Sequence, residues 1–337
     1  MKISQHSRIL NQVIVNGKKW YSLKLISFIL FVSLFIIPTY LVPSYSIPSC
    51  QCVSFRLDDV QDYWLDTVQT KIIDTFHEKN ASLTIGIIGN HIGYDSKIID
   101  EIKPKIGKSP DLEIANHGWN HENFTQFSIE DQNIMMKNTN DRISAIFGII
   151  PSVFIPPFNA INSDTMMATI TNNFTYISSD VSQDTPSIFI KNSQMYHVPG
   201  NAETSNLTNN DKIWSHHNNT HILVKIMSDI HKYGYSVVVI HPPEYAIRIH
   251  SYYANEIDKN QIKNLGLLID SVNNHGIKIV SLKQIPLQMN DKSYPNWISR
   301  IFSWNENGTI SDNQVLSTVN YLIDKKIIHL NSHSDKL

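Results

Sequence analysis

The chain has no large excess of positive or negative charge, and it contains few charged residues. The 337 residues include 28 Lys and Arg against 30 Asp and Glu, so the formal net charge is -2. Charged side chains make up only 17% of the sequence. Because a nucleic-acid-binding surface is usually strongly basic, this balance gives no sign of a nucleic-acid partner. The length suits one large α/β domain with appendages.

Acidic residues are absent from the first 24 positions, which carry five Lys and Arg. The apolar, uncharged run LISFILFVSLFIIPTYLV follows at residues 25–42 and is just long enough to span a bilayer. We expect residues 1–24 to be a basic cytoplasmic lead and 25–42 a transmembrane anchor, with the remaining chain outside the cell membrane. The rival interpretation is a cleaved signal peptide with Ser44-Tyr45-Ser46 at the cleavage site, which would make the protein secreted.

Cysteine is nearly absent, and both cysteines, Cys50 and Cys52, fall in an expected linker over residues 43–52. A single residue separates them. We therefore expect a disulfide between them to be strained, because a disulfide needs well-separated Cβ positions. Pairing with another chain, a free thiol and lipid attachment at Cys50 are the open alternatives.

The chain's chemistry begins at two adjacent carboxylates, Asp58 and Asp59. The preceding residues 53–57 (VSFRL) are typical of a buried strand, and apolar residues recur at helical spacing from Leu65 to Phe76. The acids should therefore lie on a strand-to-helix loop, at the end of the sheet where α/β folds place their functional sites. Adjacent carboxylates repel unless a cation or a proton relieves them. A helix cap beside a solvated turn residue is the simpler alternative.

Strand and helix patterns then alternate along the chain. Strands are expected at 83–88, 112–115, 153–155, 174–178, 195–198, 236–240 and 277–280, and helices at 96–106, 128–147, 165–171, 221–233 and 261–274. This alternation predicts parallel βα units, and the number of strands favours a barrel. Residues 199–219, rich in Asn, Ser and Thr, are expected to form a long surface excursion.

Three histidines stand where they could meet the two carboxylates. His117 and His121 are four residues apart, so a helical turn would point both imidazoles the same way. Two histidines and one carboxylate form a common zinc site that leaves a position for water. No Glu follows His117, so the acid pair must supply both a ligand and a general base. His241 ends the apolar strand 236–240 and belongs at the same rim, although a packing or capping role is the alternative.

The order of these segments is similar to that in the polysaccharide deacetylases of the NodB-homology type, carbohydrate esterase family 4. Four segments carry the resemblance: Phe55–Val60 is similar to Thr-Phe-Asp-Asp-Gly, His117–His121 to His-x-x-x-His, Phe154–Phe158 to Arg-Pro-Pro-Tyr, and Val239–His241 to Leu-x-His. It covers roughly residues 53 to 285.

The resemblance implies a deformed (β/α) barrel, which we expect over residues 53–288. It also implies that Asp58 is the catalytic base and His241 the acid. Asp59, His117 and His121 would bind a divalent metal ion, and zinc (Zn²⁺) is the ion expected. The implied substrate is an N-acetylated glycan, and no protein partner is indicated.

Two residues depart from the family's pattern near the carboxylates. Ile155 stands in place of the motif's Arg, which in the family helps to hold the catalytic carboxylate. Arg56 is close in sequence to Asp58 and is the candidate to compensate. Val60 replaces the Gly that follows the acid pair, so that turn must differ.

The other candidate orienting or substrate-binding residues are less well marked. Asp180 and Asp184 only loosely echo the family's Asp-rich motif, and one of them is expected to orient His241. Pro157 and Phe158 are expected beside the substrate.

The tail, residues 289–337, is predicted to form a small helical module. Its Trp297, Trp304 and Ile310-Ser311-Asp312 are similar to a tryptophan-containing module of archaeal surface proteins. A packing appendage is the alternative.

These residues support a membrane-anchored, metal-dependent hydrolase that removes N-acetyl groups from an extracellular polysaccharide. The alternative is a catalytically impaired surface protein that binds glycans, and the missing motif Arg favours it. Intact Asp58 and His241 favour the enzyme. A non-haem iron oxygenase is disfavoured because the carboxylate comes first in this chain and no His-x-Asp/Glu segment follows.

Overall fold

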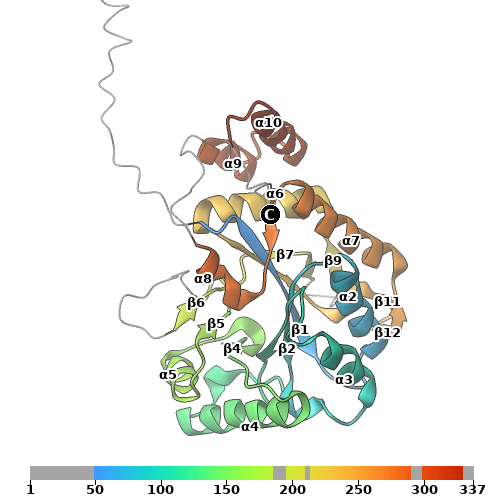
Figure 1. Ribbon diagram of the computed structural model, residues 1–337, viewed down its shortest axis with the longest axis vertical. Helices are drawn as coiled ribbons and strands as arrows, with labels where there is room; N and C mark the ends of the chain where they lie inside the picture. Colours follow the sequence, from blue (N-terminus) through green and yellow to red (C-terminus); the bar gives the residue numbers. More distant parts are fainter. Residues whose placement is uncertain (1–48, 185–194, 209–212, 290–297, 329–337) are drawn as a thin grey trace, which may run out of the picture. The chain divides into compact units, whose positions relative to one another are not determined.

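The structure is a computed structural model that describes residues 49–184, 195–208, 213–289 and 298–328 (Figure 1). The chain divides into two compact units, residues 1–45 and 46–337, and all described residues belong to the second. The expected lead and membrane anchor lie outside the described residues. Among the helices that are described, none has both the length and the apolar character needed to cross a bilayer.

A parallel sheet forms the centre of the described chain. Its nine strands run in the order β6-β5-β4-β3-β2-β1-β10-β7, with β13 also paired to β1. Their bounds are β1 Cys52–Val60, β2 Leu83–Ile87, β3 Leu112–Asn116, β4 Val153–Phe154, β5 Tyr176–Ile177, β6 Tyr196–His197, β7 Ala202–Glu203, β10 Ser236–Ile240 and β13 Lys278–Ile279. Every pairing in this sheet is parallel, which confirms the expected βα architecture of an incomplete barrel.

Helices lie around these strands (Figure 1). Their bounds are α2 Asp66–Glu78, α3 Ser96–Ile102, α4 Ile129–Phe147, α5 Ser163–Thr171, α6 Asn219–Tyr233, α7 Lys259–Asn274, α8 Ile285–Gln288, α9 Ser299–Glu306 and α10 Asp312–Asp324. Local signals set several of these ends. Ser128 caps α4 by accepting a hydrogen bond from the backbone N–H of Asp131 (3.2 Å), and Gly148 ends it with φ 74°.

The core lies between the sheet and its helices, and β1 is at its centre. Every residue of β1 is buried except Asp59. Phe55 and Leu57 pack with Ile72 and Phe76 of α2 in one apolar cluster. Each such side chain contributes about 1.5–3 kcal/mol when fully buried. The strand that carries the two acids is therefore firmly held in the core.

The tail forms two helices, as expected, and both belong to this same unit. Phe302 of α9 and Val315 of α10 join the large apolar cluster. The Nδ1 atom of His221 on α6 lies 3.1 Å from an oxygen of Asp312. Trp297 lies outside the described residues.

The prediction of a simple surface excursion over residues 199–219 is wrong. β7 joins the main sheet beside β10, through the register Val238↔Ala202 and Val239↔Glu203. β8 (Ser205–Leu207) and β9 (Trp214–His216) then form a hairpin. A second hairpin, β11 (Ala246–Ile249) with β12 (Tyr252–Ile257), was also not foreseen. The strands β7, β8 and β9 have only two or three residues each, which is too short to show alternation.

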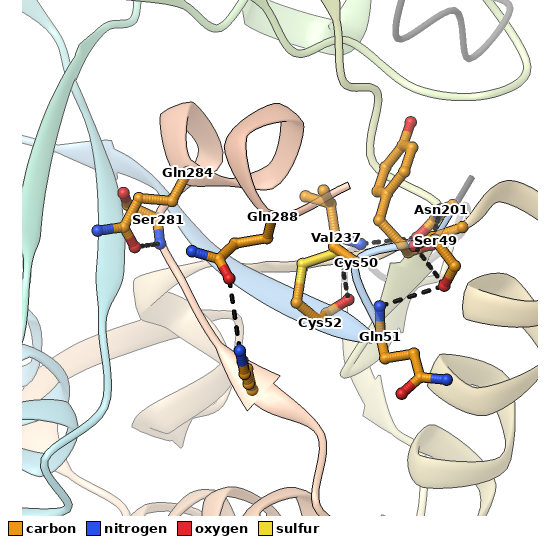
Figure 2. The surroundings of a disulfide bond; sticks show 12 residues. Ser49, Cys50, Gln51, Cys52, Asn201, Val237, Ser281, Gln284 and Gln288 are labelled. Carbon is orange, nitrogen blue, oxygen red and sulfur yellow. Dashed lines mark hydrogen bonds between the residues drawn. A yellow bond between two sulfur atoms is a disulfide. The ribbon is translucent and has the colours of Figure 1, made fainter. Parts of the chain in front are cut away.

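Cys50 and Cys52 pair with each other, so the three alternatives to this bridge do not apply. They form a disulfide with a Cα–Cα distance of 5.0 Å, which is in the usual range (Figure 2). Gln51 between them adopts φ 46°, so the chain turns sharply and the two Cβ atoms approach. Both cysteines are buried, and the backbone N–H of Cys50 donates to the carbonyl of Gly234 (2.9 Å). The bridge thus fixes the entry into β1 at the end of α6.

Candidate active site

The structure brings Asp59, His117 and His121 together at the carboxyl ends of β1 and β3. Oδ1 of Asp59 lies 3.2 Å from Nε2 of His117 and 3.0 Å from Nε2 of His121. One ligand atom from each residue falls within 4.8 Å of the others. Parallel strands end at one edge of the sheet, so residues far apart in sequence meet there.

The two histidines meet through a loop rather than the helical turn that their spacing suggested. Residues 117–121 lie outside any helix, and Gly118 (φ 78°) and His121 (φ 59°) both adopt left-handed conformations. A Cβ on Gly118 would lie 3.0 Å from Cγ of Pro157, so glycine also allows a close approach there. The chain folds back on itself, and the two imidazole centroids end 5.1 Å apart.

A second contact of His117 orients its ring for metal binding. Nδ1 lies 2.8 Å from the carbonyl oxygen of Ile155, and it can only donate to that acceptor. In the neutral ring, Nε2 then carries the lone pair that would bind a metal, an arrangement common for metal-binding histidines. When the ring is protonated, Nε2 donates to Asp59 instead. Two imidazoles and one carboxylate are the donor set of many zinc sites with an open position for water. The three residues therefore fit a divalent metal ion.

Electrostatics couple the members of this triad. Burial would raise the pKa of Asp59, but hydrogen bonds with His117 and His121 hold that pKa well below its usual value. Burial would lower the pKa of His117, but the hydrogen bond with Asp59 and the charge of Asp58 raise it. The site thus concentrates negative charge, as a cation site requires.

Asp58 has a different partner, the guanidinium of Arg56. Nε and Nη2 of Arg56 donate to the two carboxylate oxygens at 2.9 and 2.7 Å. Residues two apart on a strand share a face, which explains how two residues of β1 can pair. Arg56 is completely buried. It also donates to the carbonyls of Ser178 (2.7 Å) and Ser179 (3.0 Å) and to Oδ1 of Asn159 (2.9 Å).

Ile155, at the position of the family's Arg, packs into an apolar cluster instead. It is fully buried beside Ala115 and Val153. A guanidinium at this position would lose that packing, whereas Arg56 reaches Asp58 from its own strand.

The expectation that Asp180 or Asp184 orients His241 is wrong. Nδ1 of His241 lies 3.2 Å from Oε1 of Glu244, and the same oxygen accepts the backbone N–H of His241 at 2.7 Å. Asp184 instead binds Nδ1 of His197 (2.8 Å), and Asp180 accepts the backbone N–H of Ser182 (2.7 Å). After the short β5, the chain turns to place both acids closer to β6 and β7.

Glu244 was missed in the sequence, although a signal for it was present. It follows His241 by three residues in His-Pro-Pro-Glu, the spacing of a capping box, and is the third residue of the short helix η5 (Pro242–Tyr245). Its side chain is buried, and its second oxygen accepts hydrogen bonds from the hydroxyls of Thr204 and Ser205. Glu244 is thereby held in place to orient His241.

The surroundings of His241 favour its charged form. Burial would lower the pKa of His241, but the hydrogen bond with Glu244 and the charge of Asp58 raise it. Trp214, also missed from the sequence, lies against the imidazole with ring centroids 4.6 Å apart.

The remaining candidates lie at the rim. Pro157 and Phe158 belong to the short helix η4 (Pro157–Asn159) after β4. Phe158 adopts φ 58°, its side chain is 64% exposed, and its ring lies 4.6 Å from that of His121. Asp180 and His241 line a cavity of about 220 Å³ together with residues of β7 and α6.

A comparison with known protein families finds a match for the segment that contains the two carboxylates and the metal-binding histidines. Residues 46–177 match the family model described as polysaccharide deacetylase. Over these residues the chain is therefore similar to a polysaccharide deacetylase domain. The match runs from before β1 to the end of β5, and so it includes Asp58, Asp59, His117 and His121 but not His241. The comparisons do not support the resemblance of the tail to archaeal surface proteins.

Several solved structures that are similar to this chain are described as members of carbohydrate esterase family 4 or as peptidoglycan deacetylases. A CE4-family pseudoenzyme from Bacillus anthracis is 14% identical, with 72% of this chain and 67% of that chain covered and a TM-score of 0.47. The peptidoglycan deacetylase PdaC from Bacillus subtilis is 16% identical, with 70% of this chain and 90% of that chain covered and a TM-score of 0.45. A CE4 domain of a xylanase from the hindgut metagenome of Trinervitermes trinervoides is 14% identical, with 69% of this chain and 88% of that chain covered and a TM-score of 0.43. No curated protein matches the chain.

Proposed function

We propose that this protein is a metal-dependent hydrolase that removes N-acetyl groups from an extracellular or cell-surface glycan. One observation carries the proposal. Asp59, His117 and His121 place three donor atoms within 4.8 Å of one another, while Asp58, which directly precedes Asp59, is paired with Arg56. A metal site and a separate carboxylate are what this hydrolysis needs. The deacetylase family match over residues 46–177 supports the substrate class.

The metal site has a defined part in this chemistry. When bound, a divalent ion, with zinc expected, would polarise the acetyl carbonyl and lower the pKa of a water molecule. Asp59, His117 and His121 would hold it.

Asp58 is the base in this proposal. Its carboxylate accepts the proton of the water that adds to the acetyl carbonyl carbon. Arg56 occupies only part of the acceptor capacity of Asp58, because a carboxylate offers about four lone-pair positions. The bidentate contact fixes the orientation of the carboxylate before the reaction begins.

His241 is the acid. As the carbon–nitrogen bond breaks, its imidazolium gives a proton to the departing amine, and acetate is released. Glu244 orients the ring and favours the protonated form. A backbone N–H after Asp59 or near Phe158 would stabilise the developing oxyanion.

We also propose that the domain acts outside the cell, either anchored by residues 25–42 or secreted after their removal. The absence of acidic residues before Leu25 supports this orientation.

The second candidate function is a glycan-binding protein without activity. The argument for it was that Ile155 replaces the Arg of the family's motif. Arg56 weakens that argument, because it supplies a guanidinium to Asp58 by another route. Asp58 and His241, which a binding protein would not need, are both present with buried partners.

Acetate release from acetylated chito-oligomers tests the proposal. Purified protein with added zinc should release acetate, and Asp58→Asn should release none while it still binds zinc. Lys137→Gln, a change at an exposed side chain on α4, is the matched control and should keep wild-type activity. If the wild type binds zinc and releases no acetate from any acetylated glycan, the glycan-binding alternative replaces this proposal.

A further inference from the structure

A cavity of about 220 Å³ lies beside His241 and apart from the metal-binding triad. Its polar lining includes Asn159, Asp180, Glu203, His217, His221 and Lys225. None of Asp59, His117 and His121 lines it. Its volume is below the usual range for drug-sized ligands, so it suits a single sugar ring. It therefore has room for the part of a substrate next to the reacting unit.

The positive groups of this cavity already have partners. Lys225 forms an ion pair with Asp229, whose side chain is buried. His221 pairs with Asp312 of α10 at 3.1 Å. Burial and the nearby His221 lower the pKa of His217, which leaves it neutral at pH 7. His241 is paired with Glu244.

Two carboxylates of the cavity are only partly compensated, because the charges of His241 and Lys225 act to lower the pKa of Glu203 without forming a direct ion pair with it. Neither Asp180 nor Glu203 has an ion-pair partner among the described residues, and the carboxylate of Asp180 accepts a hydrogen bond from the backbone N–H of Ser182. Burial, then the charges of Glu244 and Asp180, raise the pKa of Glu203. An ammonium group in the cavity would relieve this repulsion.

We propose that the cavity binds a hexosamine unit that carries a free, protonated amine, beside the unit whose acetyl group is removed. The inference rests on the proposed function, because hydrolysis of an N-acetyl group leaves such an amine on the glycan. Asp180 and Glu203 would bind the ammonium, and the unused Nδ2 donor of Asn159 would serve a hydroxyl. The protein would then act next to units that are already deacetylated.

Binding of two disaccharides tests the proposal without turnover. In the Asp58→Asn background, calorimetry should show that β-1,4-linked glucosamine disaccharide binds about five-fold more tightly than its di-N-acetylated form. This ratio is the size expected of a partly exposed ion pair. Glu203→Gln and Asp180→Asn should each reduce the ratio towards one, and higher salt should do the same.

Two controls make the outcome decisive. Glu256→Gln, an exposed carboxylate on β12 outside the cavity, should leave the ratio unchanged. Methylammonium should not compete at equal amine concentration. Equal binding of both disaccharides, or a ratio that survives the double change Glu203→Gln and Asp180→Asn, overturns the proposal. Competition by methylammonium would overturn the proposal, because it would show that the cavity binds simple cations and does not recognise the sugar. Failure to release acetate would count against the proposed function and leave this titration informative.

Discussion

Arg56 and Asp58 lie two residues apart on β1 and make two hydrogen bonds, at 2.9 and 2.7 Å, with both side chains buried. His241 and Glu244 repeat this arrangement three residues apart, at the end of β10. Each proposed catalytic residue thus has its orienting partner on its own short segment. Local strand and turn geometry is enough to bring each pair together, so neither pair depends on a contact between distant segments.

We expect Arg56→Met to destabilise the protein strongly, because it leaves the buried carboxylate of Asp58 without its partner. Breaking a buried ion pair in this way costs about 3–5 kcal/mol of unfolding free energy. Urea denaturation measures it. The double variant Arg56→Met with Asp58→Asn should be more stable than Arg56→Met alone, since it removes both charges. A single variant as stable as the wild type would show that the pair is dispensable for folding.

We expect His117→Ala to lose the metal, because one of three ligands and the contact with Ile155 both disappear. Elemental analysis of the wild type should find about one zinc per chain. Asp58→Asn should keep its zinc, since Asp58 is paired with Arg56 and is absent from the ligand cluster. Full zinc occupancy in His117→Ala would remove this site from consideration.

The long strands and helices of the fold could be predicted from the sequence, because their patterns are local. β10 has a run of apolar residues, β1 alternates apolar and polar residues from Val53 to Leu57, and α4 and α6 have clear caps and apolar periodicity. The two-residue strand β7 has no such pattern. Its place beside β10 is set by tertiary packing, and with it the position of Glu203.

The candidate site divides in the same way. The metal triad could be predicted because its residue types and spacing are distinctive, although the loop geometry at Gly118 could not. Glu244 was missed because a buried orienting carboxylate looks like any other acid in a sequence. Asp184 was misassigned for the converse reason, since its true partner, His197, could not be identified from sequence spacing.

We expect loss of the Cys50–Cys52 disulfide to cost little stability. The bridge encloses a single residue, so it removes little conformational entropy from the unfolded chain, roughly 1–2 kcal/mol. Urea denaturation of the double variant Cys50→Ser with Cys52→Ser measures the loss, and mass spectrometry of the wild type verifies the bridge. A loss well above this range would mean that the bridge does more than close its own short loop.

We expect the pH dependence of kcat/KM to depend on the His241–Glu244 pair. The acid must be protonated, and the pKa of His241 is raised above its usual value of about 6.5. A raised pKa keeps the proton on His241 to higher pH, so activity should fall only as pH rises through that higher value. The charged groups that raise the pKa of His241 most are Glu244, Asp58 and Asp59. Only Glu244 among them is neither the proposed base nor a metal ligand, so it can be changed selectively.

Glu244→Gln should therefore shift the alkaline limb to lower pH, because it removes the hydrogen-bonded charge that favours the imidazolium. Loss of the acid itself in His241→Ala should lower kcat by about 10²–10⁴-fold and abolish that limb. Glu244→Asp keeps the charge on a shorter side chain and should retain part of the shift. Glu256→Gln, an exposed change on β12, is the control and should leave the profile unchanged. An alkaline limb at the same pH in Glu244→Gln and in the wild type would assign the limb to another group, and His241 would lose its role as the acid.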